Sequence, residues 1–428
     1  MAPPTPFPRA VSRYRVPLAL LVALTFLGGL ATAVAPDRPA PAAEAAPARV
    51  TEVRSLLDRR ARALLARDEA AFTADLDPLA DPGFRQRQRD LFRNLAAVPL
   101  AEWGYLLGSG ETDLSSLVPP AADEAWAPGV RLSYRLRGVD AEPSGQGMAY
   151  LFTRRGDRWY LNSDTALEPL GRRTWRGPWD FGPCQVHGGP GGFVISHPGG
   201  EVLARRALAE LDGAVRAVTE VWGRAWARQV AVLVPSGVEE MSALVGPGFA
   251  TGAIAGVAVA DRVDPATRTA RGQRVVLNPD SAGALSPIAL RVLLRHEITH
   301  VAVRGETADG APMWLLEGFA DYVGYRGSGV PPRRAAPLLA AAVREAPPTG
   351  LPSDADFRGP DMELAYQQAW SLNEYLASVL GEPGLVELYR RLARAPASEV
   401  DELLPELTGW GVAELVSGWR EYLAATFP

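Results

Sequence analysis

Two of the four histidines in this 428-residue chain lie four positions apart, at His296 and His300, and Glu297 directly follows the first. Residues four apart on an α-helix project from the same side, so both imidazoles can bind one metal ion through bonds of about 2.0–2.1 Å. Glu297 lies beside this pair and can reach a water molecule on the metal without being a ligand. The residue types and their spacing therefore predict a zinc site with an adjacent general base.

A zinc enzyme needs a third protein ligand and one open coordination position. Residues 314–322, "WLLEGFADY", supply a carboxylate at Glu317, on a helix that we expect to begin at Pro312. Gly318 has no side chain and allows a second helix to approach closely. Asp321 follows Glu317 by four residues, so it shares the same face and can accept a hydrogen bond from the far nitrogen of a ligating histidine.

The combination of H-E-x-x-H with W-L-x-E-G-x-A-x-Y resembles the peptidase MA-like group of gluzincins, which are zinc metallopeptidases related to thermolysin. The matching residues are 295–300 and 314–322, and the element order from about residue 201 to 428 is compatible. The resemblance implies that zinc is the metal, with His296, His300 and Glu317 as ligands.

The same resemblance gives roles to neighbouring residues. It implies that Glu297 is the general base on a zinc-bound water, and that Asp321 hydrogen-bonds to a ligand histidine. Gluzincins commonly place a tyrosine or histidine beyond the ligand helices to stabilise the oxyanion. Tyr366, in "ELAYQQAWSLNEYL", is the candidate, with Tyr322 less favoured and a core aromatic as the alternative interpretation of Tyr366.

The helix that carries the two histidines must be positioned by its own apolar side. Apolar residues recur at helical spacing on a second face of this helix, and we expect that face to pack into the core. They are Leu290, Leu294, Ile298 and Val301. Ser286 and Pro287 predict where the helix begins, because serine caps helix N-termini and proline is favoured at the first helical position.

The order of elements from residue 201 onwards, strands first and helices afterwards, is typical of an α+β domain. We expect a long amphipathic helix over 201–226, a mostly helical region beyond Met313, and strands at 229–235, 253–260 and 274–280. The strand at 273–278 is the candidate edge strand for pairing with an extended peptide, with an ordinary core strand as the alternative. Residues 201–428 are thus predicted to form a gluzincin-like peptidase domain with a small sheet.

A smaller α+β domain is expected over residues 49–165. Helical spacing comes first, followed by the alternating strand 130–138 and a hairpin that turns at Gly156 and Asp157. This order resembles the cone-shaped fold of SnoaL-like and nuclear-transport-factor-like proteins, or a cystatin-like arrangement. No catalytic constellation is present in it, so we interpret it as an accessory domain.

Residues 166–200 are rich in Gly, Pro and Trp and are expected to form an irregular connector. Cys184 and His187 have the spacing of a metal-binding pair, but a site needs three or four ligands, so both are interpreted as structural, as is His197. Because Cys184 is the only cysteine, a thiol-ligated zinc ribbon is excluded.

The N-terminus carries basic residues followed by an uncharged apolar stretch from position 16 to 35. Twenty such residues suffice to cross a bilayer, and the basic flank is expected to stay on the cytoplasmic side. Residues 1–35 are therefore interpreted as a single-pass membrane anchor with the body outside the cytoplasm, or alternatively as a cleaved signal sequence of a secreted protein. Residues 36–48 are interpreted as a Pro/Ala-rich linker.

A net charge of −5 argues against nucleic-acid binding. The expected partner is a peptide or protein substrate, and no Gly-x-Met-x-Asn-type element for a free amino terminus is evident, which favours internal cleavage. Two alternatives stay open: an inactive peptidase fold that binds peptides or envelope components, and a structural envelope protein in which zinc only stabilises.

Overall fold

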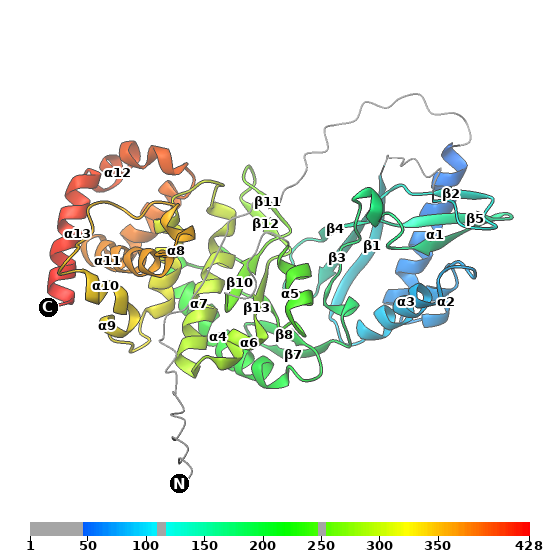
Figure 1. The fold of residues 1–428 in the computed structure, drawn as a ribbon, viewed down its shortest axis with the longest axis horizontal. Helices are drawn as coiled ribbons and strands as arrows, with labels where there is room; N and C mark the ends of the chain where they lie inside the picture. Colours follow the sequence, from blue (N-terminus) through cyan, green and yellow to red (C-terminus); the bar gives the residue numbers. More distant parts are fainter. Residues whose placement is uncertain (1–45, 109–116, 247–253) are drawn as a thin grey trace, which may run out of the picture.

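The computed structural model describes residues 46–108, 117–246 and 254–428, and it shows an elongated molecule with an N-terminal lobe, a central sheet and a helical C-terminal end (Figure 1). The predicted membrane segment lies outside the described residues. Within the described ranges, no helix is both long and apolar enough to cross a membrane. The mixed α+β class predicted from the sequence is confirmed.

The N-terminal lobe places helices before strands, as the sequence predicted. Its helices are α1 (Ala46–Leu65), α2 (Glu69–Thr73) and α3 (Pro82–Asn94). Its strands are β1 (Leu100–Gly108), β2 (Glu124–Trp126), β3 (Gly129–Leu136), β4 (Ser144–Met148), β5 (Leu151–Arg155) and β6 (Arg158–Ser163). They form two three-stranded antiparallel sheets in the orders β1-β3-β4 and β2-β5-β6. The hairpin between β5 and β6 turns at Gly156, with φ +59°, as expected.

A buried carboxylate, Asp77, connects the α-helical part of this lobe to its second sheet. Its oxygens accept hydrogen bonds from Arg155 at 2.8 and 2.9 Å, from Thr153 at 2.6 Å, from Asn162 at 2.8 Å and from the Leu79 amide at 2.8 Å. Burial raises the pKa of Asp77, but Arg155 and the other donors outweigh it and lower the pKa to about 2. The ionised form is therefore the one that the fold stabilises.

We expect Asp77→Asn to lower the free energy of unfolding by about 3 kcal/mol near pH 7, because Arg155 loses its buried partner. A depressed folded-state pKa stabilises the fold above the unfolded-state value near 4, and that stabilisation is lost as the pH falls towards 2. The wild type should therefore lose more of its melting temperature between pH 4 and 2 than Asp77→Asn. The exposed Asp58→Asn is the control, and equal pH slopes in wild type and Asp77→Asn would contradict the prediction.

The central sheet has five strands in the order β10-β13-β9-β8-β7. These are β7 (Gln185–Gly189), β8 (Gly192–Ser196), β9 (Val230–Leu233), β10 (Gly256–Val259) and β13 (Arg274–Leu277). The inner pairs β8–β9 and β9–β13 are parallel, and the outer pairs β7–β8 and β10–β13 are antiparallel. Helix α4 (Glu201–Trp222) packs on β7 and β8 and contacts α7 (Pro287–Val303), which itself packs on β10 and β13.

The expectation of an irregular connector over 166–200 was wrong for its last part, because β7 and β8 belong to the central sheet. Strand β8 is a fully buried apolar run, which has no alternation that would mark it as a strand. Gly192 begins it with φ +128°, and a Cβ there would collide with the Val230 carbonyl oxygen. The glycine that looked like a loop signal is thus needed for close pairing with β9.

His197 and Cys184 have structural surroundings, in line with their interpretation. His197, just after β8, contacts Glu240 Oε1 through Nε2 at 2.9 Å and the Pro183 carbonyl through Nδ1 at 3.1 Å. Glu240 belongs to α5 (Val238–Val245), so this buried pair attaches α5 to the end of the sheet. Cys184 is a buried free thiol.

The proposed peptide-binding edge strand was wrong in its position. Strand β13, at 274–277, lies between β10 and β9, so both of its edges are already hydrogen-bonded. Strand β10 pairs antiparallel with the outer side of β13 and is itself the edge strand of the sheet. A short two-stranded hairpin, β11 (Arg262–Asp264) and β12 (Thr269–Arg271), connects β10 to β13.

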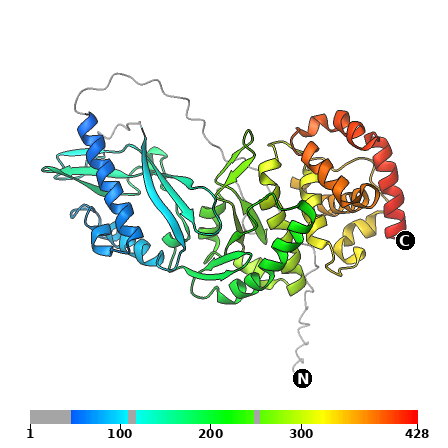
Figure 2. The same ribbon diagram turned by 180° about the vertical axis from the view of Figure 1, so that it is seen from behind.

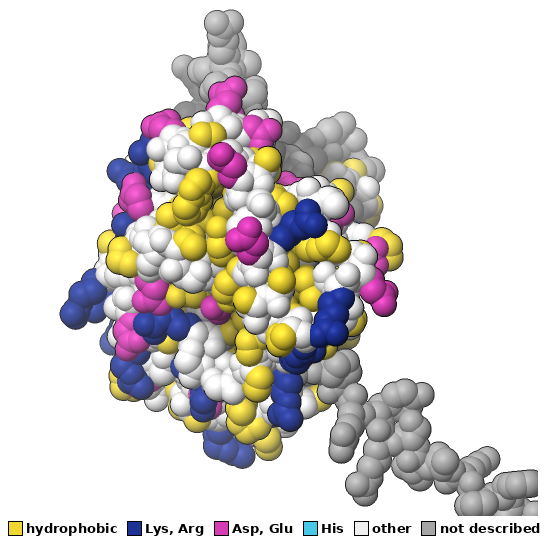
Figure 3. Space-filling view, turned by 90° about the vertical axis from the view of Figure 1, so that its left-hand side faces the viewer, with side chains coloured by type: hydrophobic (Ala, Val, Ile, Leu, Met, Phe, Trp, Pro, Cys, Tyr) yellow, Lys and Arg dark blue, Asp and Glu magenta, His cyan; other side chains and the backbone are white. Residues whose placement is uncertain are grey.

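The chain beyond residue 313 is mostly helical, as predicted, and forms the end of the molecule opposite the N-terminal lobe (Figure 2). Its helices, which follow α6 (Pro279–Ala284) and α7, are α8 (Met313–Tyr325), α9 (Pro332–Ala335), α10 (Pro337–Ala342), α11 (Met362–Leu392), α12 (Val400–Thr408) and α13 (Val412–Thr426). On this end of the molecule, arginine and acidic side chains are interspersed around exposed apolar ones (Figure 3). Helix α11 is the main packing partner of α8.

Candidate metal centre

Helix α7 begins as its sequence predicts. The Ser286 hydroxyl accepts a hydrogen bond from the Ala289 amide at 3.2 Å, and Pro287 occupies the first helical position. The predicted apolar face is buried, but so are His296, Glu297 and His300. The helix is enclosed by α4, α8 and the β10–β13 pair, so the site lies inside the fold rather than on a surface face of the helix.

Helix α8 is held between two other helices by two glycines. A Cβ at Gly318 would collide with the Ala369 carbonyl oxygen on α11, whereas a Cβ at Gly324 would lie 3.1 Å from the Val292 carbonyl oxygen on α7. Gly318 therefore allows the close approach of α8 to α11. The close approach of α8 to α7, the helix that carries the histidines, occurs at Gly324. Asn373 on α11 donates to the carbonyl oxygens of Trp314 and Ala369, which fixes α8 against α11.

The start of α8 is fixed by a residue that sequence reasoning missed. Pro312, where we expected the helix to begin, is the residue before its first turn, and the Met313 amide donates to Asp354 Oδ1 at 2.9 Å. Asp354 lies 41 positions further along the chain, in a segment without regular structure, so no local pattern marks it as a cap. Fixing the first turn of α8 also fixes the direction in which Glu317 points.

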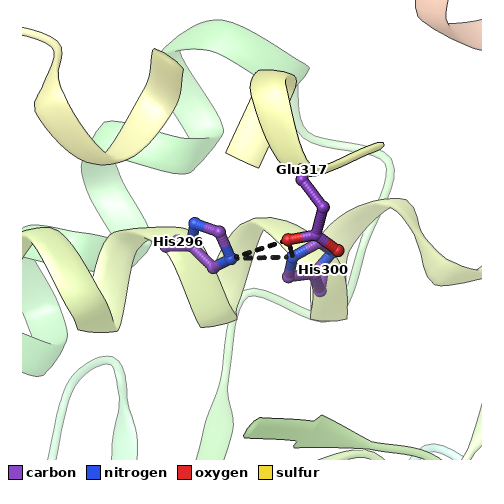
Figure 4. A group of neighbouring side chains, drawn as sticks. All are labelled: His296, His300 and Glu317. Atoms are coloured by element: carbon purple, nitrogen blue, oxygen red, sulfur yellow. Dashed lines mark hydrogen bonds and ion pairs between the residues drawn. The ribbon is translucent and has the colours of Figure 1, made fainter. Parts of the chain in front are cut away.

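His296, His300 and Glu317 converge on one point between α7 and α8 (Figure 4). The Nε2 atoms of the two histidines are 3.0 Å apart, and Glu317 Oε2 lies 3.4 Å from His296 Nε2 and 3.7 Å from His300 Nε2. All three side chains are buried. In the described part of the chain, this is the only cluster of three or more His, Cys, Asp or Glu side chains with the spacing of a metal site.

The donor set fits a zinc ion. Two imidazole nitrogens and a carboxylate oxygen are the ligands of many catalytic zinc sites, with one position left for water or substrate. Apart from the two histidines, the Glu317 oxygens have no hydrogen-bond partner among the described residues. A fully buried carboxylate whose only partners are two histidine nitrogens offers its charge to a cation held by the same three groups, so the arrangement fits a bound divalent metal.

Asp321 orients the first histidine. Its Oδ1 lies 2.7 Å from His296 Nδ1, so Nδ1 donates to Asp321 and Nε2 is the nitrogen directed at Glu317 and His300. Burial lowers the pKa of His296, but Asp321 and Glu317 outweigh it and hold the pKa well above its ordinary value in the metal-free site. Asp321 was predicted from its four-residue spacing to Glu317, and the structure places it beside the far nitrogen of His296.

We expect Asp321→Asn to weaken zinc binding by about 10- to 100-fold, because the amide no longer favours the tautomer with a free Nε2. The measurement is a competition titration of the full-length chain against a chelator of known affinity. Asp354→Asn is a matched control, since an asparagine oxygen can still accept from the Met313 amide and the residue touches no histidine. Unchanged zinc affinity in Asp321→Asn would show that Asp321 does not orient His296.

Glu297 points to the other side of the cluster, towards strand β10. Its side chain is fully buried, and neither oxygen has a standard hydrogen-bond partner among the described residues. Burial raises its pKa, His296 lowers it and Glu317 raises it again, to about 7 in total, with a small lowering contribution from the Ala258 backbone on β10. A carboxyl group with a pKa near neutrality is suited to taking and returning a proton.

Tyr366 lies on the first turns of α11, the helix that supports α8. It is 6% exposed, and its ring packs edge-on against Phe357 at 5.2 Å between centroids. The less favoured candidate, Tyr322, donates its hydroxyl to Glu382 at 2.8 Å. Tyr322 is therefore occupied elsewhere, and Tyr366 stays a prediction for the oxyanion-stabilising residue.

The site as a whole is a His–His–Glu cluster with the spacing of a metal site, on two packed helices, and the buried carboxyl group of Glu297 lies between it and the edge strand of the mixed sheet. Two histidines, a carboxylate and a neighbouring buried carboxyl group are the set of groups found in zinc hydrolase sites, so this is a candidate site of that class.

No protein-family model and no curated protein sequence matches the chain. Among solved structures, it is similar to an M1 zinc metallopeptidase variant from Deinococcus radiodurans, with 17% identity, a TM-score of 0.32, and coverage of 64% of this chain and 59% of that one. It is also similar to native leukotriene A4 hydrolase from Saccharomyces cerevisiae, with 10% identity, a TM-score of 0.32, and coverage of 76% and 60%. The chain thus spans about three fifths of the length of these structures.

Proposed function

We propose that this protein is a zinc-dependent metallopeptidase that hydrolyses peptide bonds outside the cytoplasm. The observation that carries the proposal is the convergence of three buried donors, His296, His300 and Glu317, beside the buried carboxyl group of Glu297. The H-E-x-x-H and W-L-x-E-G-x-A-x-Y motifs, with their resemblance to gluzincins, support the same conclusion. The location is proposed from the basic and apolar N-terminal sequence alone.

His296, His300 and Glu317 would hold the zinc ion. A bound zinc supplies Lewis acidity, which lowers the pKa of water and polarises a carbonyl group. The protein's own residues do the rest of the chemistry. Asp321 keeps His296 in the tautomer that binds metal, and the enclosing helices exclude bulk water from the site.

Glu297 is the proposed general base. It accepts a proton from the attacking water and then donates it to the leaving amine, so that one group serves both steps. Its surroundings support this, because burial raises the pKa while the neighbouring His296 lowers it, and the result lies near 7. Tyr366 is proposed to donate a hydrogen bond to the developing oxyanion.

Strand β10 is the proposed substrate-binding strand, in place of the strand predicted from the sequence. It is the edge of the central sheet on the side of α7, and a Cβ at Gly256 would lie 3.4 Å from Glu297 Cγ. An extended peptide that pairs with this edge passes next to the general base.

The test is digestion of a diverse peptide library by the full-length chain loaded with one zinc per molecule. We expect cleavage at internal peptide bonds, its loss on chelation and its recovery when zinc is returned. A folded and zinc-loaded chain that cleaves none of the peptides contradicts the proposal. Binding of uncleaved peptides by that chain would indicate the inactive peptide-binding alternative.

A further inference from the structure

The N-terminal lobe is attached to the central sheet by a buried ion pair at the end of the β10–β13 hairpin. Arg274, the first residue of β13, donates from Nη1 and Nη2 to the two carboxylate oxygens of Asp140 at 2.7 and 2.8 Å. The two side chains are only 6% and 3% exposed. Asp140 follows strand β3 and also accepts from the Leu136 amide at 2.8 Å. Such a two-point, buried charge pair fixes both partners in one orientation.

A second contact holds the other strand of the same hairpin. Asp261, two residues after β10, accepts a hydrogen bond from Gln146 on β4, an edge strand of the N-terminal lobe. Gly272 lies against this contact with φ +63°. A Cβ at position 272 would collide with Asp261 Oδ2 and would lie 2.6 Å from Ser144 Oγ on β4. The glycine therefore permits β4 to sit directly on the end of the hairpin.

Strand β10 connects these contacts to the candidate metal site. Arg274 is paired in register with Val259, the last residue of β10. Gly256, at the other end of β10, faces Glu297. Gly256 and Val259 are three positions apart on β10, which corresponds to about 10 Å along the strand. The lobe thus holds one end of the strand whose other end borders the general base.

We infer that the N-terminal lobe, through Asp140 and Arg274, positions edge strand β10 for the binding of substrate residues on the amino-terminal side of the cleaved bond. This inference rests on the proposed peptidase function. Antiparallel pairing is the commoner geometry, and in it the amino-terminal part of the peptide runs alongside the carboxyl-terminal end of β10, where the lobe is attached. Asp140 and Arg274 are positioning residues, because they act on the substrate through β10.

The test compares two peptides that share one scissile bond. One has a single residue before that bond and the other has four, so only the longer peptide can pair along β10. In full-length Asp140→Asn, we expect kcat/KM to fall about tenfold or more for the longer peptide and much less for the shorter one, since small displacements of a binding strand have large effects. Zinc content should stay at one per chain.

Asp77→Asn is the matched control, because it makes the same chemical change at a buried ion pair inside the N-terminal lobe. We expect it to change both peptides by the same factor. If Asp140→Asn also changes both by the same factor, or changes neither, the inference is wrong, because a general loss of folded protein does not depend on peptide length.

A measurement without substrate separates this inference from the proposed function. In hydrogen exchange of the zinc-loaded full-length chain, Asp140→Asn and Gly272→Ala should each speed exchange of the β10 amides at least about tenfold, while the α7 amides stay protected. If the wild type cleaves no peptide, the proposed function fails and this result still decides whether the lobe holds β10. Unchanged β10 exchange in both variants overturns the inference.

Discussion

Glu297→Gln should reduce peptide hydrolysis by about 10²- to 10⁴-fold while zinc content stays near one per chain. The amide has nearly the same shape as the carboxylate but cannot accept a proton, so the water is not activated. His296, His300 and Glu317 are unchanged, and the metal position does not include residue 297. The measurement is kcat of the wild type and of Glu297→Gln, with the zinc content of both proteins determined by elemental analysis. A fully active Glu297→Gln variant would show that another group is the base.

The same residue predicts how wild-type activity depends on pH. A general base works only when it is deprotonated, so kcat/KM should fall as the pH drops below the pKa of Glu297. Burial and Glu317 raise that pKa, and His296 lowers it, to about 7 without metal. A bound cation favours the ionised form, so we expect the acidic decline at or below about pH 7. A rate that rises towards acidic pH would contradict the assigned role.

Glu317→Gln should lose both zinc and activity. The substitution removes one ligand and the negative charge that compensates the ion, so we expect zinc affinity to fall by more than about 100-fold, beyond the effect of a residue that only orients a ligand. This distinguishes it from Glu297→Gln, which keeps its zinc. Glu374→Gln, which neutralises a half-buried carboxylate on α11 outside the cluster, should keep both zinc and activity.

Thermal unfolding gives a second check on Glu317. Without metal, burial raises the pKa of Glu317, but His300 and His296 outweigh it and hold the pKa below its ordinary value, so removing the carboxylate should lower the melting temperature of the metal-free chain. With zinc present, the wild type should gain stability through mass action and Glu317→Gln should gain little. Equal zinc-induced stabilisation of the two proteins would contradict the assignment of Glu317 as a ligand.

Sequence reasoning was most successful where the determining contacts are local. The spacing of His296 and His300, the Ser286 cap and the position of Asp321 relative to Glu317 all follow from the geometry of one helix turn. These features bring the cluster close to its final form once two helices meet. The hairpin at Gly156 is local in the same sense.

The features that were missed depend on partners distant in the chain. Whether β13 or β10 is the edge strand is decided by the order of five strands, which no single segment encodes. Strand β8 was hidden because it is buried on both faces and begins at a glycine. Asp354 and Asn373 fix α8 through contacts 41 and 59 positions away, for which the sequence gives no signal.

The sandwiching of α8 between α7 and α11 has a consequence for the order in which the protein matures. The ribosome adds all three ligand residues to the chain well before it reaches Ala369 and Asn373, the residues of α11 that pack against α8. A nascent chain ending shortly after Tyr325 therefore contains every ligand yet lacks the surface that aims Glu317 at the histidines. Tight metal capture should accordingly be a late event in biogenesis, coupled to the docking of the C-terminal helices.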